Sequence, residues 1–345
     1  MGREGTRQDR RAWKQNQEAV FGNPDFVRER VLALLPESAN KGAQPEWRFE
    51  IVRNKAAGRS TLLYSAGASA RIYGKAYFDF AAADEAHRSL THLWTNGFVS
   101  GSILEVPEPL GIVPEANLVL MRSAEGAPMD QRAGSVPLEA SLTDARLAAQ
   151  WLVKFQNTAI PGLRAESPCE KLEILKIADA VAKVAAECPE HSSLLIDMIH
   201  DLRAVTPKSN ASPAVAPMHG QFRPAHVFID GSRATVIDVE KLCLSDPAKD
   251  VARFCHVLKK TCLEERGDPD RAERVAQEFV SEYGAHSAGN LENLAYFRAL
   301  LAFKAFAKLL KNRKVDAAQR ESMGRAYQAE FERWVRCGAV SEMAA

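Results

Sequence analysis

Polar residues that can carry out chemistry are concentrated in one stretch of the chain, residues 218–254. Two short β-rich runs, at 227–229 and 235–237, flank an Asp-Gly-Ser-Arg-Ala segment, which is the composition of a hairpin with a short loop. Antiparallel pairing about this loop places His226 roughly opposite Asp238, with Cβ atoms about 5 Å apart. We therefore expect His226 and Asp238 to be able to bind a divalent cation together.

Further polar side chains flank the predicted hairpin. His219 and Gln221 lie on a Pro-containing loop that leads into the first strand, so both can point toward the same space. Downstream, Asp246 and Pro247 precede apolar residues at helical spacing, which is typical of an N-cap followed by proline at the first helical position. A helix start therefore accounts for most of the signal at Asp246 and Asp250.

The order of these residues resembles the catalytic segment of the aminoglycoside phosphotransferase and choline kinase family, small-molecule kinases with a protein-kinase-like fold. The family pattern is approximately H-G-D-[LF]-x-x-x-N, a hairpin, I-D-x-[ED] and G-D-P-x-x-D. The matching residues are His219, Gly220, Phe222, Ile237, Asp238, Glu240, Asp246, Pro247 and Asp250. Three positions depart from the pattern. Gln221 stands in place of the catalytic Asp, His226 in place of a metal-binding Asn (Gln in one branch), and Ser245 in place of a Gly.

The resemblance also implies nucleotide contacts in the first part of the chain. Lys75 lies in the middle of a predicted strand, where a buried ammonium needs a partner. It matches the third-strand Lys of the family, and Glu85 in the following helix matches the Glu that pairs with it. Met121 and Ser123 end a short apolar strand that resembles the family's hinge, whose backbone contacts an adenine or guanine base. Alternatively, the Lys75 side chain extends to solvent and Glu85 lies on a solvated helix face, with no functional role for either residue.

Phosphoryl transfer needs positioned phosphates, a cation and a group that orients the attacking hydroxyl. The resemblance implies that Lys75 pairs with the phosphates of ATP or GTP and that Asp238 binds Mg²⁺ or Mn²⁺. Glu240 supports this site or faces away from it. Because Mg²⁺ prefers oxygen ligands, His226 weakens a magnesium site or biases it toward Mn²⁺; alternatively, His226 binds no metal and fills space.

Two residues occupy the positions of the catalytic loop, Gln221 and His219. Gln221 cannot accept a proton as a carboxylate does, and general-base assistance contributes about 10²–10⁴ in rate. We therefore expect a kinase with a low rate of turnover rather than an inactive protein. His219 can be imagined as a general base, but the resemblance favours a structural role in which it braces the loop by hydrogen bonds.

Two functions follow from these residues. The first is ATP- or GTP-dependent O-phosphotransfer to a small-molecule hydroxyl by an atypical site. The second is a pseudokinase that binds a nucleotide, metabolite or peptide as a scaffold or partner protein. Another transfer reaction at the same nucleotide cleft is a weaker third interpretation. The sequence does not identify the acceptor, because variable helices form the acceptor pockets of the family.

The hydrophobic pattern agrees with an α+β protein of two lobes, a small antiparallel-sheet N-lobe and a larger, mainly helical C-lobe. Residues 1–45 are expected to form a polar tail and a short helix, residues 46–122 the N-lobe, and residues 123–345 the C-lobe with the segment 218–254. Strands are predicted near 47–51, 61–64, 71–78 and 117–121. Helices are predicted near 26–35, 83–94, 142–155, 170–188, 192–204, 249–265, 270–284, 290–312 and 316–336.

Composition limits the partners. The chain carries 45 Lys plus Arg against 44 Asp plus Glu, so no strong overall charge favours nucleic acid or an anionic membrane. The N-terminus lacks the apolar run of a signal peptide, and the most apolar helix contains three basic residues, which excludes a membrane span. Six cysteines without a Cys-x-x-Cys pair indicate reduced thiols. We expect a cytoplasmic protein with a small-molecule or peptide substrate and an undetermined oligomeric state.

Overall fold

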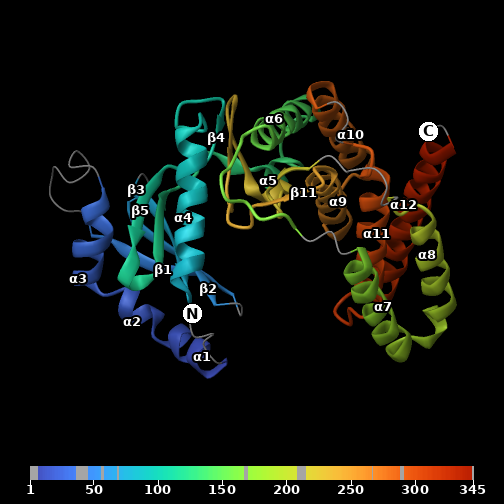
Figure 1. Cartoon of the computed structure of the whole chain (residues 1–345), viewed down its shortest axis with the longest axis horizontal. Helices are drawn as coiled ribbons and strands as arrows, with labels where there is room; N and C mark the ends of the chain where they lie inside the picture. The colour runs from blue at the N-terminus through green and yellow to red at the C-terminus, as the bar shows by residue number, and fades with distance from the viewer. Residues whose placement is uncertain are drawn as a thin grey trace. The chain divides into compact units, whose positions relative to one another are not determined.

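The computed structural model describes residues 7–35, 46–55, 58–67, 70–166, 170–207, 215–265, 267–287 and 291–343 (Figure 1). The chain divides into two compact units. The first unit comprises Met1–Gly126 and Asp230–Glu240, and the second comprises Ala127–Ile229 and Lys241–Ala345. Within the described ranges, no helix is long and apolar enough to cross a membrane.

The first unit is built on a five-stranded antiparallel sheet with the strand order β1-β2-β3-β6-β5. The strands are β1 (Arg48–Lys55), β2 (Arg59–Ala66), β3 (Ala70–Tyr77), β5 (Pro109–Val113) and β6 (Leu118–Arg122). The predicted strands at 47–51, 61–64, 71–78 and 117–121 are all present. The structure adds β5, which a Pro-containing sequence does not suggest. It lies at the sheet edge, where the missing N–H of a proline removes no central ladder bond.

The two faces of this sheet have different chemistry because successive side chains point to opposite sides. One face carries apolar side chains, and its core residues are Leu62, Tyr64, Ile72, Ala76, Leu118 and Leu120. Lys75 and Tyr77 alternate with them on β3 and lie on the other face. Helix α4 (Phe80–Thr95) contacts β3, β5 and β6 and lines a cavity together with these two side chains. The side chain of Asp79 caps α4 by accepting the N–H of Ala81.

The apolar face is covered by N-terminal helical segments. These are α1 (Arg7–Gln15), α2 (Gln17–Phe21), α3 (Pro24–Phe26), a π-helical turn at Val27–Val31 and a 3₁₀ turn at Leu32–Leu34. Phe21, Val27 and Val31 are buried in the same core as the sheet residues. Where the sequence predicted a short helix packed on the first lobe, the structure places α3 and these two turns against the sheet. The prediction of a polar tail is wrong for residues 7–21, which form α1 and α2. Burial of Phe21 of α2 against the sheet stabilises this segment.

Residues 230–240 belong to the first unit through a short parallel strand pair. Strand β10 (Arg233–Val236) pairs with β4 (Leu104–Glu105), with Ala234 opposite Leu104 and Thr235 opposite Glu105. The hydroxyl of Thr235 donates to the Glu105 carboxylate at 3.2 Å, and Arg233 forms an ion pair with the same carboxylate. This pairing fixes the position from which the chain leaves β10.

The second unit is mainly helical, as predicted. Its helices are α5 (Met129–Arg132), α6 (Leu138–Gln156), α7 (Glu170–Glu187), α8 (Ser192–Ala204), α9 (Ala248–Glu264), α10 (Pro269–His286), α11 (Leu294–Leu310) and α12 (Ala317–Met343). Short strands interrupt the helices. β7 (Ala127–Pro128) pairs with β9 (Val227–Asp230), and β8 (Ala216–Met218) pairs with β11 (Cys243–Ser245).

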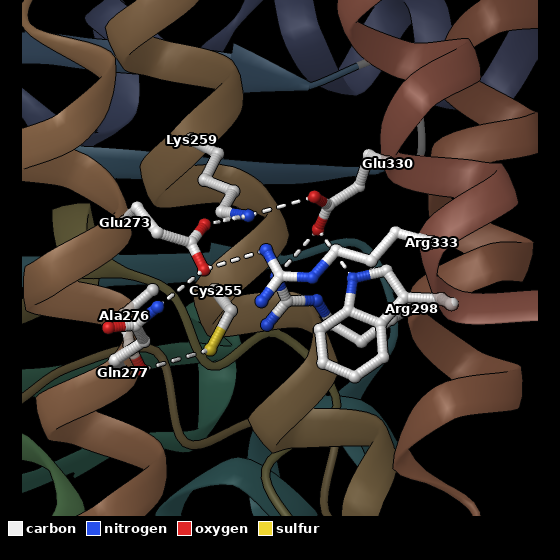
Figure 2. A network of polar contacts seen from close by, with 9 residues as sticks. Cys255, Lys259, Glu273, Ala276, Gln277, Arg298, Glu330 and Arg333 are labelled. Atoms are coloured by element: carbon white, nitrogen blue, oxygen red, sulfur yellow. Dashed lines mark hydrogen bonds and ion pairs between the residues drawn. The ribbon is translucent and has the colours of Figure 1, made fainter. Parts of the chain in front are cut away.

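An ionic network joins the four C-terminal helices (Figure 2). Figure 2 shows Lys259 of α9 between the carboxylates of Glu273 on α10 and Glu330 on α12. The Nζ of Lys259 donates to Glu330 at 2.8 Å. Arg298 of α11 donates to Glu330 at 2.6 Å, and its side chain is only 4% exposed. Arg333 of α12 donates to Glu273 at 2.8 Å. Each buried cation is therefore paired, as the desolvation of charge requires.

The cations set the protonation of Glu330. Burial raises the pKa of this carboxyl, but the charges of Arg298 and Lys259 outweigh burial and hold the pKa at about 2. Since the pKa is depressed in the folded protein, the stabilisation is fully present above the unfolded value of 4.5. It is lost as the pH falls through about 2.

Replacing Glu330 by Gln tests this network. We expect the free energy of unfolding to fall by about 3 kcal/mol at pH 7, because Arg298 loses its partner. Urea denaturation measures the change, and the deficit should shrink between pH 4.5 and 2. Glu321→Gln on the same helix is the control, because the exposed Glu321–Arg325 pair should contribute less than about 1 kcal/mol. Equal losses in the two variants would contradict the role of Glu330.

Candidate functional site

Lys75 is the centre of a buried charge cluster in the first unit. Its position in β3, opposite Thr61 of β2 and Val119 of β6, directs it away from the apolar core. Nζ donates to Oδ1 of Asp238 at 2.5 Å and also to Oε1 of Glu240. The second oxygen of Glu240 pairs with Arg59. Two cations and two carboxylates thus neutralise one another, with side chains between 6% and 16% exposed.

Asp238 reaches Lys75 from an uncommon backbone conformation. Its φ of 70° lies in the left-handed region, which Asp tolerates better than most non-glycine residues. The residue follows β10, whose pairing with β4 fixes the strand end. A conformation of this kind costs on the order of 1–3 kcal/mol and persists where the surroundings determine it, as is frequent at functional sites.

The cluster lines a small cavity. Lys75 and Tyr77 of β3, Val119 and Met121 of β6, Ala86 and Leu90 of α4, and residues 238–240 surround it. Its volume is about 10 Å³, which is roughly the space for one water. The structure therefore brings together Lys75, Met121 and Asp238, which the sequence singled out separately. A nucleotide would enter this space only if the charge cluster rearranged.

Two other predicted nucleotide contacts also belong to this unit. Ser123 follows β6, and its N–H donates to the carbonyl of Arg71 at 3.2 Å while Oγ donates to the carbonyl of Ala124 at 3.1 Å. Glu85 is exposed on α4, about a third of a turn around the helix from the cavity-lining Ala86. The roles of Ser123 and Glu85, including the pairing of Glu85 with Lys75, stay predictions.

In the second unit, Asp250 anchors the loop that matches the catalytic segment. Its carboxylate accepts the N–H of His219 at 2.6 Å and the N–H of Gly220 at 3.1 Å, and also the N–H of Phe222. Complete burial raises the pKa of Asp250 to about 6, although these N–H groups and Arg253 act in the opposite direction. Asp250 is therefore more than a residue of the α9 start, because it shapes the loop from a separate helix.

His219 is built into the core beneath this loop. The ring is fully buried, with its centroid 5.8 Å from that of Phe222 and 6.1 Å from that of Trp151. Its Nδ1 accepts the N–H of Gln221 at 3.3 Å. A buried imidazole that holds the loop backbone supports the predicted bracing role.

The side chains of Gln221 and His226 have different surroundings. Among the residues that the structure describes, the buried amide nitrogen of Gln221 has no hydrogen-bond partner. His226 ends a 3₁₀ turn at Pro224–His226, and its Nε2 accepts the Nε–H of Arg223 at 2.8 Å. A metal ion bound to Nε2 of His226 would have to displace Arg223. The predicted metal pairing of His226 with Asp238 joins residues of different units and stays a prediction.

A divalent cation in this cluster would have only two carboxylate ligands from the described part of the chain, Asp238 and Glu240. In the described part of the chain, no group of three or more His, Cys, Asp or Glu side chains is arranged to hold a metal. Mg²⁺ is commonly bound by one or two carboxylates together with substrate phosphates and water. Asp238 and Glu240 fit this requirement, because both already coordinate the same ammonium.

Sequence reasoning missed one residue of the charge cluster, Arg59, and one residue that lines the cavity, Tyr77. Arg59 begins β2 directly after a turn and pairs with Glu240. Tyr77 is two residues beyond Lys75, and strand alternation alone places it on the same face. The alternation at Tyr77 could therefore have been read from the sequence. The pairing of Arg59 could not, because its partner, Glu240, is distant in the sequence.

Comparison with known proteins supports this fold. The pattern of the family described as "Phosphotransferase enzyme family" matches residues 70–290. A choline/ethanolamine kinase family protein from Mesorhizobium loti is similar in structure, with a TM-score of 0.55, 16% identity, and coverage of 91% of this chain and 98% of its own. The GDP complex of an aminoglycoside 2'-phosphotransferase-IIIa has a TM-score of 0.55 and 14% identity over 90% of this chain and 97% of its own.

A third structure, an amicoumacin kinase in complex with AMP-PNP and Ca²⁺, has a TM-score of 0.55 and 10% identity, covering 88% of this chain and 95% of its own. No curated protein matches the chain. At these identities the structural likeness concerns the fold. The predicted fold class, a protein-kinase-like fold with an antiparallel-sheet N-terminal part and a helical C-terminal part, is confirmed.

Asp250→Asn tests the anchor of the loop. We expect the free energy of unfolding to fall by about 2–3 kcal/mol, because Asn offers one acceptor oxygen and its NH₂ group opposes backbone donors. Urea denaturation measures stability, and hydrogen exchange reports the N–H groups of His219 and Gly220. Asp268→Asn is the matched control, since Asn caps α10 about as well as Asp. If Asp250→Asn changed stability as little as the control, the anchoring role would be wrong.

Proposed function

The chain belongs to the phosphotransferase enzyme family, and we propose that it transfers a phosphoryl group from ATP or GTP to a small-molecule hydroxyl. The observation that carries the proposal is the cluster in which Lys75 meets Asp238 and Glu240 beside Met121. An ammonium and two neighbouring carboxylates are the groups that a phosphate chain and its cation require. The resemblance seen in the sequence assigns these groups the same roles.

Binding in this cavity is an exchange of partners. Phosphate oxygens would replace the carboxylates around the Lys75 ammonium, and Asp238 with Glu240 would hold the divalent cation instead. The cation, when bound, supplies charge neutralisation on the phosphates. Because a buried carboxylate left unpaired is unfavourable, nucleotide and cation should bind together. Met121 and the β6 end provide the backbone that would contact the base.

Transfer forms a bond from the acceptor hydroxyl oxygen to the γ-phosphorus while the bond from that phosphorus to the β-phosphate oxygen breaks. The hydroxyl proton must leave, and Gln221 cannot take it. The proton would pass to water, so the reaction should be slower than with a carboxylate by about 10²–10⁴. The GDP and AMP-PNP present in similar structures support either purine nucleotide as the donor.

Gln221 also favours the second candidate function, a pseudokinase. An amide in place of the catalytic carboxylate, with a buried nitrogen that lacks a partner among the described residues, suits a protein that binds a nucleotide, metabolite or peptide without turnover. The two functions share the Lys75 cavity and differ at Gln221. Cys188, Cys243, Cys255 and Cys262 are free thiols, which supports a reducing, cytoplasmic setting for either function.

Nucleotide titration tests the cavity. We expect ATP or GTP to bind with Mg²⁺ or Mn²⁺ present, and Lys75→Met to weaken binding at least ~10-fold through loss of a charged contact. Asp238→Asn should weaken binding chiefly when the cation is present. Isothermal calorimetry measures the affinities, with Lys183→Met on the exposed face of α7 as the control. Unchanged affinity in the Lys75 and Asp238 variants, or no binding at millimolar nucleotide, would refute the assignment.

Gln221→Asp separates a weak kinase from a pseudokinase. We expect nucleotide hydrolysis or transfer to rise at least ~10-fold, because the carboxylate restores general-base assistance. Adding His226→Asn should raise the rate further with Mg²⁺, which prefers oxygen ligands. Gln221→Asn, which has the size of Asp without its charge, is the control. A double variant that folds and binds nucleotide without any gain would favour the pseudokinase.

A further inference from the structure

The hydroxyl of Tyr77 is a buried polar group in the Lys75 cavity. The residue is 5% exposed and lines the cavity, and among the described residues its hydroxyl has no hydrogen-bond partner. A buried polar atom without a partner costs about 1–3 kcal/mol. Most such atoms in native proteins are satisfied by protein, water or ligand. The position of this hydroxyl therefore suggests a partner that arrives from outside the chain.

The β-sheet register places Tyr77 among groups that attract anions. Tyr77 is two residues from Lys75 on β3 and lies directly opposite Arg59 on β2, so the three side chains share one face of the sheet. Burial raises the pKa of Tyr77, with the charge of Arg59 lowering it and that of Asp238 raising it. The phenol is thus close to both charges and stays a protonated donor at neutral pH.

The same charges decide which partner the hydroxyl takes. The carboxylates of Asp238 and Glu240 are held by Lys75 and Arg59, two cations that would turn to phosphate oxygens when a nucleotide enters. An oxygen-rich anion held between these cations would therefore be on the same face of the sheet as the phenol. A hydroxyl that donates to such an anion forms a charge-assisted hydrogen bond, which is stronger than a neutral one.

We propose that the Tyr77 hydroxyl donates a hydrogen bond to a phosphate oxygen of the bound nucleotide and is a nucleotide-binding residue of this site. The inference rests on the proposed function, since it requires a nucleotide in the Lys75 cavity. It predicts that removal of the Tyr77 hydroxyl oxygen affects stability and nucleotide affinity differently. The free protein should lose no stability, whereas the complex should lose affinity.

Tyr77→Phe tests the proposal. We expect the melting temperature of the free protein to stay unchanged or rise, because the substitution removes a polar atom that has no partner in the cavity. The Kd for ATP with Mg²⁺, measured by calorimetry, should rise about 10-fold, in the range expected for a hydrogen bond to a charged group. The Kd for adenosine, which has no phosphate, should not change.

Tyr64→Phe is the matched control. Tyr64 is fully buried on the same sheet, and within the described ranges its hydroxyl also lacks a hydrogen-bond partner, but it lies on the apolar face in contact with Phe49. Burial raises its pKa as it does that of Tyr77. We expect Tyr64→Phe to change stability as Tyr77→Phe does and to leave ATP affinity unchanged.

Four results would overturn the proposal. A Tyr77→Phe protein that melts several degrees earlier would show a structural hydroxyl. Equal weakening of ATP and adenosine would place Tyr77 against the base or ribose, or assign it to packing. ATP binding that depends on Lys75 but not on the Tyr77 hydroxyl would remove this inference and leave the proposed function standing. If the unaltered protein binds no ATP, the proposed function fails and this inference falls with it.

Discussion

The architecture of the first unit depends on one electrostatic requirement, that an ammonium placed inside a sheet be neutralised. Removing a charge from water costs several kcal/mol, and only close partners offset this cost. Lys75 obtains them from Asp238 and Glu240, and the surplus negative charge is balanced by Arg59. The strand pair β4–β10 and the left-handed backbone at Asp238 serve this arrangement, because they deliver the carboxylates to the middle of β3.

The sheet separates this charged site from an apolar core by alternation alone. Side chains of the same strands face the N-terminal helices on one side and the cavity on the other. The helical segments before residue 36 precede the part of the chain that matches the family pattern, residues 70–290. They nevertheless pack against the apolar face of the sheet. The structural unit that supports the site is therefore larger than the segment that identifies the family.

Local patterns in the sequence predicted the elements well. Alternation identified β1, β2 and β3, a continuous apolar run identified β6, and helical periodicity identified α4 and the helices α6 to α12. The same reasoning placed Lys75 mid-strand and required a partner for it. The identity of that partner was not predictable, because the runs at 227–229 and 235–237 indicate a hairpin but carry no signal for its pairing with the two-residue strand β4. Asp250 looked like a residue of a helix start, and only tertiary contacts reveal that it holds the loop at His219.

The grouping of Asp230–Glu240 with Met1–Gly126 has a consequence for how the protein is made. Translation delivers the sheet, α4 and the N-terminal helices first, yet the carboxylates that neutralise Lys75 and Arg59 leave the ribosome only once residue 240 has been synthesised. Domains generally fold as units while the chain grows from its N-terminus. In this protein, Lys75 and Arg59 on the cavity face of the first unit have no carboxylate partners from residues 238 and 240 until those residues have been synthesised. Nascent chains shorter than 240 residues therefore carry an incomplete first unit, which lacks the carboxylates of Asp238 and Glu240 as well as the buried side chains of Ala234, Val236 and Val239.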